Sequence, residues 1–260
     1  MAEKKVTDPR SESRTDFDFD IVDPDAAEQS VPTYPIAQWH NGQQALKSMG
    51  GVQYTGGVIL PAKYLTGGLI PDGWTTGEVT FLSGKKETVA ATQKIVFAPI
   101  RTRFRWFVKQ GDETIYHPRN AYSPPVNMRG HLQVLSAVHG VGEPIVITFK
   151  GKASQAFEAL IKDFDIKVMY VANHKAPKGK PLPRYAFWMT IAPGPHSKAG
   201  NAGRESLITP PTLVLPDIIT REYLLSCYAG RETLERAQEW YRQADTWASA
   251  WDADTEEVLN

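Results

Sequence analysis

The sequence predicts an α+β protein built mainly on an antiparallel β-sheet or an OB-like barrel, with one inserted helix and a C-terminal helical pair. From about residue 35, short apolar runs alternate with glycine pairs and prolines, which is typical of strands joined by tight turns. Apolar residues at helical spacing occur once in the middle of the chain and again after Pro216. The composition, 42% hydrophobic and 10% aromatic residues in a chain of 260, supplies enough apolar surface for a large core.

Residues 1–33 form a polar, acidic segment without apolar periodicity, so we expect a disordered acidic tail there. A β-rich core domain is expected over residues 34–215. Its strands are expected near residues 52–60, 77–83, 93–109, 113–117, 131–139, 144–150, 167–172 and 185–192. This order indicates a sheet or a barrel rather than a regular alternation of strands and helices.

One helix is expected to interrupt the strands shortly after residue 150. Ser154 is a candidate N-cap residue for it. After this residue in the sequence, apolar residues at i, i+3, i+4, i+7 spacing form one face that is expected to be buried: Phe157, Leu160, Ile161 and Phe164. We therefore expect this helix to plug the sheet.

Two C-terminal helices packed on the core are expected over residues 216–251, followed by a second acidic tail over residues 252–260. The first spans Ile219–Ala229 and ends at Gly230, and the second runs from about Arg231 to Trp251. The second helix carries a continuous apolar stripe, which consists of Leu234, Ala237, Trp240, Tyr241, Ala244, Trp247, Ala248 and Trp251. The stripe either docks on the chain's own core or binds a partner or a second copy.

Charge is segregated along the chain, although 29 basic and 29 acidic residues cancel formally. Residues 1–30 carry nine acids against four bases, and residues 251–260 carry four acids. The body between them holds 25 bases against 16 acids, and the segment from Phe81 to Arg204 holds 19 against seven. A field of one sign on this scale attracts polyanions and predicts a nucleic-acid partner. The alternative is a protein whose tails neutralise its own surface.

The segment Pro99–Lys109 carries the main functional hypothesis. As a strand, its side chains alternate between two faces. An apolar face suited to a core consists of Ile100, Thr102, Phe104, Trp106 and Val108. The opposite face consists of Arg101, Arg103, Arg105, Phe107 and Lys109. We expect this second face to be open to solvent and to bind single-stranded nucleic acid, with cations on phosphates and the ring stacked on a base. The alternative is a solvated face whose arginines pair with carboxylates.

Further cations extend the predicted interface. The segment from Ala172 to Arg184 is expected to be a mobile basic hairpin loop that closes over the strand. Its cations are Lys175, Lys178, Lys180 and Arg184. Lys150 and Lys152, at the end of a predicted strand, extend the same patch. Additional stacking candidates beside polar or glycine-rich turns are Trp39, Trp74 and Tyr116.

Three segments, Tyr34–Gly42, Tyr54–Leu60 and Ala244–Trp251, resemble uncharacterised β-rich proteins of phages, plasmids and related mobile elements. The resemblance implies a genomic setting in which proteins of replication and recombination are frequent. The acidic ending after Trp251 also resembles the acidic tails of bacterial and phage single-stranded DNA-binding proteins. A tail of this kind competes with nucleic acid for a basic groove or presents acids to a partner protein.

Reactive groups in a catalytic pattern are missing from the sequence. No pair of its six histidines has the spacing of a metal site, and Cys227, the one cysteine, completes no zinc set and forms no intramolecular disulfide. Asp163 and Asp165, two residues apart on a helix, face different ways, which argues against a two-metal nuclease. We therefore expect no metal, no cofactor and no enzymatic activity. No secretory leader opens the sequence, so we expect a cytoplasmic protein. No apolar run approaches the roughly 20 residues that a membrane-spanning helix needs, so we expect no membrane span.

Three functional hypotheses follow from the sequence. The leading one is a sequence-tolerant single-stranded DNA-binding protein of replication or recombination that coats or anneals strands, with RNA as the other possible ligand. The alternative is a structural or assembly protein of a phage or mobile element that forms a homo-oligomer or binds a partner through its C-terminal helix. The third is an enzyme acting on nucleic acid through a site assembled from distant residues.

Overall fold

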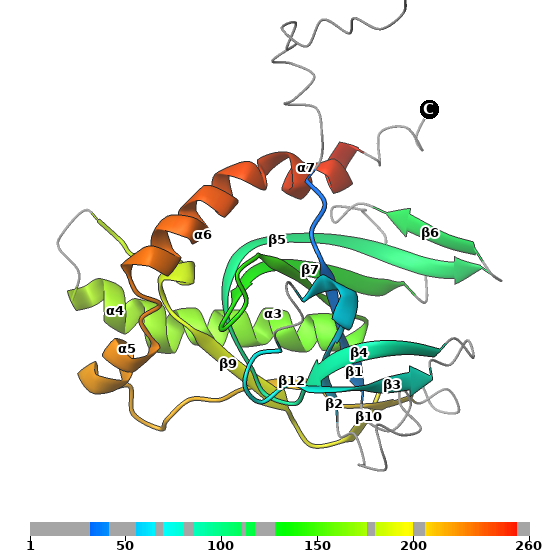
Figure 1. Cartoon of the computed structure of the whole chain (residues 1–260), viewed down its shortest axis with the longest axis horizontal. Helices are drawn as coiled ribbons and strands as arrows, with labels where there is room; N and C mark the ends of the chain where they lie inside the picture. Colours follow the sequence, from blue (N-terminus) through cyan, green and yellow to red (C-terminus); the bar gives the residue numbers. More distant parts are fainter. Residues whose placement is uncertain are drawn as a thin grey trace, which may run out of the picture. The chain divides into compact units, whose positions relative to one another are not determined.

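An open, mostly antiparallel β-sheet of ten strands organises the fold (Figure 1). The computed structural model describes residues 32–41, 56–65, 70–80, 86–110, 113–117, 128–175, 180–199 and 206–253. The strands follow the order β12-β9-β5-β7-β8-β1-β2-β4-β3, and β6 pairs with β5 outside this path. Their bounds are β1 Ile36–Asn41, β2 Gly56–Pro61, β3 Thr75–Thr80, β4 Lys86–Thr92, β5 Ile95–Gln110, β6 Glu113–His117, β7 Arg129–Val138, β8 Ile145–Lys150, β9 Met189–Pro193 and β12 Pro211–Leu213.

The described strands do not close into a ring, because β12 and β3 remain at the two ends of the order. The fold is therefore mixed α+β with a large open sheet, and the barrel alternative is not confirmed. The one parallel pair among the described strands joins β1 to β8. A separate two-stranded sheet is formed by β10 Ser197–Ala199 and β11 Ser206–Ile208.

Strand β5, with 16 residues, is the longest of the described strands, and it carries five of the eleven predicted site residues. It pairs with β7 over most of its length and with β6 near its end. A register shift between Pro99 and Arg101 bulges the strand, so that Ile100 packs with Ala98 and Leu135 on the arginine side. The sequence placed Ile100 on the opposite face, because simple alternation does not anticipate a bulge.

One face of the sheet packs against helix α3, Lys152–Phe164. Phe157 of α3 is fully buried and stacks on Phe149 of β8 with the ring centroids 4.1 Å apart. The helix begins after Gly151, and the Ser154 hydroxyl donates to the Gly151 carbonyl at 2.7 Å, so Ser154 is inside the helix and is not its N-cap. A side chain at Gly130 would lie 2.5 Å from that hydroxyl oxygen, which explains the glycine at this close approach.

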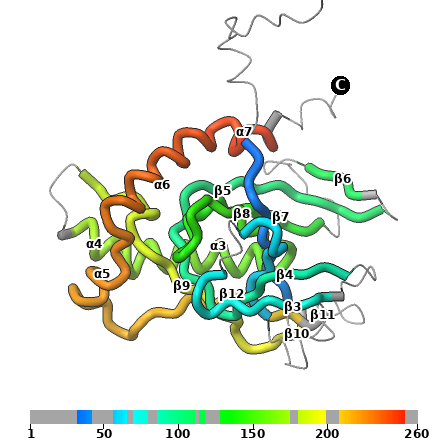
Figure 2. The backbone as a smooth tube through the Cα atoms, viewed as in Figure 1, coloured from blue at the N-terminus to red at the C-terminus, as the bar shows by residue number. Residues whose placement is uncertain are grey.

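The other face of the sheet is covered by helices α6, Arg231–Gln243, and α7, Asp245–Ala253. Ala237, Ala244 and Trp247 are buried against residues of β5, β7 and β8. The tube in Figure 2 follows α6 and α7 along β5, on the side of the strand away from α3. Helix α5, Arg221–Cys227, precedes α6, and the Thr220 side chain caps it by accepting from the Tyr223 amide. The sheet and the C-terminal helices belong to one compact unit from Pro32 onward.

Several sequence-based element predictions were wrong. The expected strand at residues 167–172 is helical, because α3 continues through a π-helical turn, Asp165–Met169, into α4, Tyr170–Lys175. The π-turn keeps Val168 and Met169 buried on the same side, so their apolar run belongs to a helix. The single long helix expected after residue 230 is divided at Ala244 into α6 and α7. Strands β1, β4, β10, β11 and β12 were not anticipated.

No helix in the described part of the chain is both long and apolar enough to cross a membrane. The predicted acidic tails lie almost wholly in residues 1–31 and 254–260, outside the described residues.

Candidate nucleic-acid interface

The three arginines of β5 interleave with aromatic side chains from the C-terminal helices. We call Arg101, Arg103 and Arg105 the arginine row. They lie on one face of β5, two residues apart, and α6 and α7 lie over that face. Each guanidinium is within about 4 Å of at least one ring centroid. The face that the sequence predicted to bind nucleic acid therefore contacts the chain's own C-terminal helices.

Arg101 is held by α6 and the start of α7. Its Nη1 forms an ion pair with the Asp245 carboxylate at 2.8 Å, and its guanidinium carbon lies 4.1 Å from the centre of the Tyr241 ring. The arginine side chain is 19% exposed, whereas that of Asp245 is 79% exposed. The pair therefore joins a largely buried cation to a carboxylate at the surface.

Arg103 is the most strongly held member of the arginine row. Its guanidinium carbon lies 4.2 Å from the ring centroids of both Trp247 and Trp251. Its Nε donates to the Gln133 side chain at 2.8 Å, and its Nη1 donates to the Trp247 carbonyl at 2.8 Å. The Gln133 amide in turn donates to the Thr148 hydroxyl at 3.3 Å, which extends the polar contact across three strands.

Arg105 lies between the Tyr116 ring of β6, 3.4 Å away, and the Trp251 ring, 4.0 Å away. Phe107 lies next along the strand against Tyr116 and His131. Phe107 is only 8% exposed. The ring that was expected to stack on a base is therefore covered, whereas Tyr116 on the neighbouring strand is 37% exposed.

The prediction that this strand face is open to solvent was wrong for Arg101, Arg103, Arg105 and Phe107. Its alternative, arginines on a solvated face paired with carboxylates, was also incomplete, because aromatic rings contact all three arginines, whereas a carboxylate pairs with Arg101. The apolar stripe of the last predicted helix supplies those rings, so two of its tryptophans contact the chain's own sheet. Periodicity identified both surfaces but did not show that they cover each other.

Four cations remain exposed at the end of the sheet where β5 finishes and α3 begins. They come from strands β5, β7 and β8 and from the first residue of α3. We call them the cationic end; they are Lys109, Arg129, Lys150 and Lys152. No ion pair joins any of them to a carboxylate within the described residues. Lys109, Lys150 and Lys152 of the predicted interface therefore lie together and accessible, and Arg129 was missed.

The electrostatics of the cationic end are those of a site crowded with positive charge. Lys150 is exposed but partly desolvated by its neighbours; this partial burial, and next the charge of Lys109, lowers its pKa. Burial, and then nearby cations beginning with Lys150, lowers the pKa of His131 to about 3. Burial and Lys150 likewise lower the pKa of His40 to about 4. Both imidazoles are therefore neutral at pH 7 and flank Lys150 on its two neighbouring strands. This potential favours an anionic ligand.

The second predicted basic element does not join this site. Residues 172–175 are helical, so the expected hairpin loop was wrong, and Lys178 and the side chain of Lys175 lie outside the described residues. Lys180 is exposed. Arg184 forms a two-point ion pair with Asp165, at 2.8 and 2.5 Å. Both residues lie near the far end of α3, about 20 Å from Lys152 by the rise of the helix.

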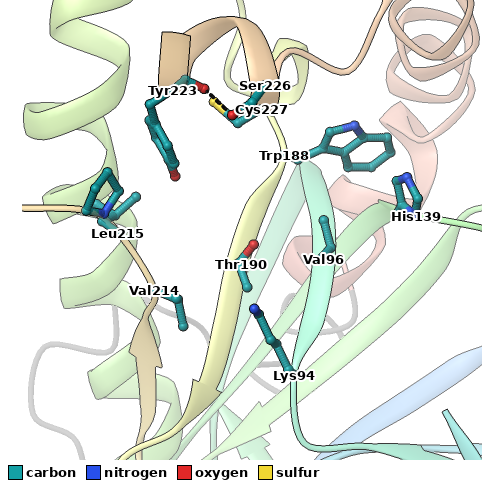
Figure 3. A pocket seen from close by; sticks show the side chains of 11 residues that line it. Lys94, Val96, His139, Trp188, Thr190, Val214, Leu215, Tyr223, Ser226 and Cys227 are labelled. Carbon is teal, nitrogen blue, oxygen red and sulfur yellow. Dashed lines mark hydrogen bonds between the residues drawn. The ribbon is translucent and has the colours of Figure 1, made fainter. Parts of the chain in front are cut away.

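The chain also contains a cavity of about 580 Å³ between β9, α5 and the start of β5 (Figure 3). Trp188 and Tyr223 form aromatic walls, and Thr190 and Lys94 contribute a hydroxyl and an ammonium. Cys227 also lines it, and burial raises the pKa of this thiol to about 11, so it is not a nucleophile at neutral pH. The cavity is at the opposite end of β5 from the cationic end and is separate from the interface.

No group of three or more metal-binding side chains occurs in the described ranges. A hydroxyl and an imidazole do meet where Thr209 Oγ1 lies 2.8 Å from His196 Nδ1. Thr209 is 1% exposed, and its amide and carbonyl hold Asn41 and Trp39 of β1. This contact therefore ties the chain after β11 to the sheet and offers no access to a substrate.

No protein-family model, curated protein or solved structure matches this chain. The arrangement of charge and rings is thus the basis on which a function can be assigned.

Proposed function

We propose that this protein binds single-stranded nucleic acid, DNA in the first place, without sequence preference and at the cationic end of the sheet. The observation that carries the proposal is that the exposed cations Lys109, Arg129, Lys150 and Lys152 lie at the end of the sheet that also holds the exposed ring of Tyr116, with no carboxylate paired to them in the described structure. The proposal assigns binding and no reaction.

The chemistry of the cationic end suits a strand better than a duplex. Ammonium and guanidinium groups contact phosphates without regard to sequence, and an exposed ring stacks on any base. The Arg105 guanidinium lies against the Tyr116 ring, 3.4 Å from its centroid, so Arg105 positions the ring. Oligonucleotide-binding barrels bind a strand with a sheet face and flanking loops. Here we propose that the strand binds at the end of an open sheet.

Fluorescence anisotropy with a labelled 30-residue oligo-dT at several salt concentrations tests the proposal. The variant combining Lys109→Gln with Lys150→Gln should bind more weakly. The slope of log affinity against log salt should become shallower by about 1.4, since each phosphate contact on a single strand contributes about 0.7. The matched control combines Lys94→Gln with Lys162→Gln, which removes the same charge from exposed positions elsewhere.

The ring is tested separately. Tyr116→Ala should weaken binding about tenfold, in line with the loss of one stacked base, whereas Tyr116→Phe should bind as the parent protein does. Equal affinity and equal salt slope for all these variants would refute the assignment of the cationic end. Repeating the titration with oligo-U distinguishes DNA from RNA through the 2′-hydroxyl.

A further inference from the structure

We propose that the sheet face beneath α7 is a second interaction surface for single-stranded nucleic acid, and that α7 occupies it until a strand displaces the helix. This inference rests on the proposed function and extends the same site from the cationic end to the arginine row. It follows from the chemistry of α7, from the polar atoms buried beneath it and from the break between α6 and α7.

Helix α7 offers the arginine row the two kinds of group that a single strand carries. Asp245 gives Arg101 an anionic oxygen at 2.8 Å, as a phosphate would. Trp247 and Trp251 give Arg103 flat rings on which the guanidinium lies, as bases would. The helix and a strand can therefore satisfy the row through equivalent contacts.

The surface beneath α7 contains polar atoms that the helix does not satisfy. The Tyr34 hydroxyl, Arg101 Nε and His131 Nε2 are buried without a hydrogen-bond partner among the described residues. Tyr34 contacts the Trp247 ring, and His131, only 7% exposed, lies 4.9 Å from the Trp251 ring. Buried polar groups are nearly always paired, so their number under one short helix indicates a surface made for a more polar occupant. Phosphates, base edges and bridging water supply the partners that indole rings lack.

The break at Ala244 allows α7 to leave without α6. Ala244 has φ −85° and ψ 12°, away from α-helical values, so the helix is distorted there, although the Ala244 amide still donates to the Trp240 carbonyl at 3.0 Å and its carbonyl accepts from the Ala248 amide at 2.9 Å. Helix α7 has nine residues, a length at which an isolated helix is marginal in water. Helix α6 remains attached through Ala237, which is fully buried against the sheet. Displacement thus requires the loss of one short helix only.

Hydrogen–deuterium exchange of the full chain with and without 30-residue oligo-dT tests the displacement directly. We expect the amides of residues 245–253 to exchange faster in the bound protein, because a displaced helix loses its hydrogen bonds, while strands β5 and β7 exchange more slowly. A helix with a purely structural role would be unchanged or better protected on binding.

Affinity provides the second measurement. Asp245→Asn removes the exposed ion pair with Arg101 and should raise the affinity for oligo-dT about two- to fivefold. Trp251→Ala should raise it about tenfold, because the variant frees Arg103 and Arg105 from one ring each. Glu239→Gln on α6 is the matched control: its carboxylate contacts only Gln243 among the described partners, so affinity should not change.

The outcomes separate this inference from the function on which it rests. Faster exchange in α7 together with tighter binding by Asp245→Asn supports both. Binding with α7 unchanged or protected, and no gain for Asp245→Asn, overturns the displacement and leaves the proposed function in place. Failure of the parent protein and of every variant to bind the oligonucleotide overturns both.

Discussion

Arg103→Ala should destabilise the folded protein strongly, whereas the same truncation at an exposed binding residue would leave its stability nearly unchanged. The side chain joins β5 to β7 through Gln133 and to α7 through the Trp247 carbonyl, with both bonds at 2.8 Å. It also lies against two indole rings, each with its centroid 4.2 Å away. Truncation to alanine removes all four contacts and leaves Gln133, which is 5% exposed, without one of its partners.

The magnitude follows from these contacts. A cation–π contact at a partly covered site contributes about 0.5 to 1 kcal/mol. A hydrogen bond from a charged donor contributes about 1.5 to 3 kcal/mol, and neighbouring contributions do not add fully. We therefore expect the free energy of unfolding to fall by about 3 kcal/mol. Arg103→Lys keeps the charge but lacks the planar fork and should recover less than half of that loss.

Urea unfolding followed by circular dichroism measures this change. Lys109→Ala is the matched control, because it removes one cation from the same face of the same strand at an exposed position, and it should shift the unfolding free energy by less than about 0.5 kcal/mol. A loss below about 1 kcal/mol for Arg103→Ala would show that the contacts between α7 and the arginine row do not hold the helix, and the reasoning would be refuted.

Three further predictions concern pH, thiol reactivity and one glycine. Burial holds the pKa of His131 near 3 in the folded protein, against about 6.5 in the unfolded chain. The unfolded chain therefore binds more protons below pH 6.5. The contribution of this histidine to stability is lost as the pH falls from about 6.5 towards 3. The contribution changes by about 1.4 kcal/mol per pH unit, so His131→Gln should flatten the fall in urea midpoint between pH 7 and 5; an unchanged slope would contradict it. The pKa of Cys227 is raised to about 11, so native protein should react with iodoacetamide far more slowly than unfolded protein at pH 8, and faster as pH rises; equal rates would contradict the burial. Gly57→Ala should lower the unfolding free energy by at least about 2 kcal/mol, because φ is +135° and the new carbon would lie 2.2 Å from the Thr92 carbonyl oxygen, whereas Gly142→Ala, with open space around it, should not.

The elements with a strong local signal could be predicted from the sequence. The buried face of α3 follows the predicted spacing, with Phe157, Leu160 and Phe164 all buried. The two-residue alternation of β5 correctly separated the arginine row from the apolar face, apart from Ile100 at the bulge. Both signals depend only on neighbours in sequence, which is why periodicity could reveal them.

The parts that were missed depend on contacts between distant residues. Strand β1 begins with Ile36, which is 49% exposed, and its six residues lack a clear pattern; the parallel pairing with β8 holds it in the sheet. The cover over the arginine row comes from a helix more than 140 residues further along, as the bond from Arg103 to Trp247 shows. Exposure of a strand face is a property of the whole fold, so composition and charge could not decide it.

One sequence signal could nevertheless have joined the arginine row to its cover. Alternate residues of a strand advance by about 6.7 Å, and residues four apart on a helix advance by about 6.0 Å. Arginines at positions i, i+2 and i+4 of a strand are thus nearly in step with Trp247 and Trp251 on a helix, and a guanidinium fits between rings at that repeat. When a cationic strand and an aromatic helix of matching repeat occur in one chain, we expect the helix to pack on the cationic face of the strand. An outside ligand then has to compete with an internal one, which is why the free cationic end, and not the arginine row, is the place where we expect a strand to make first contact.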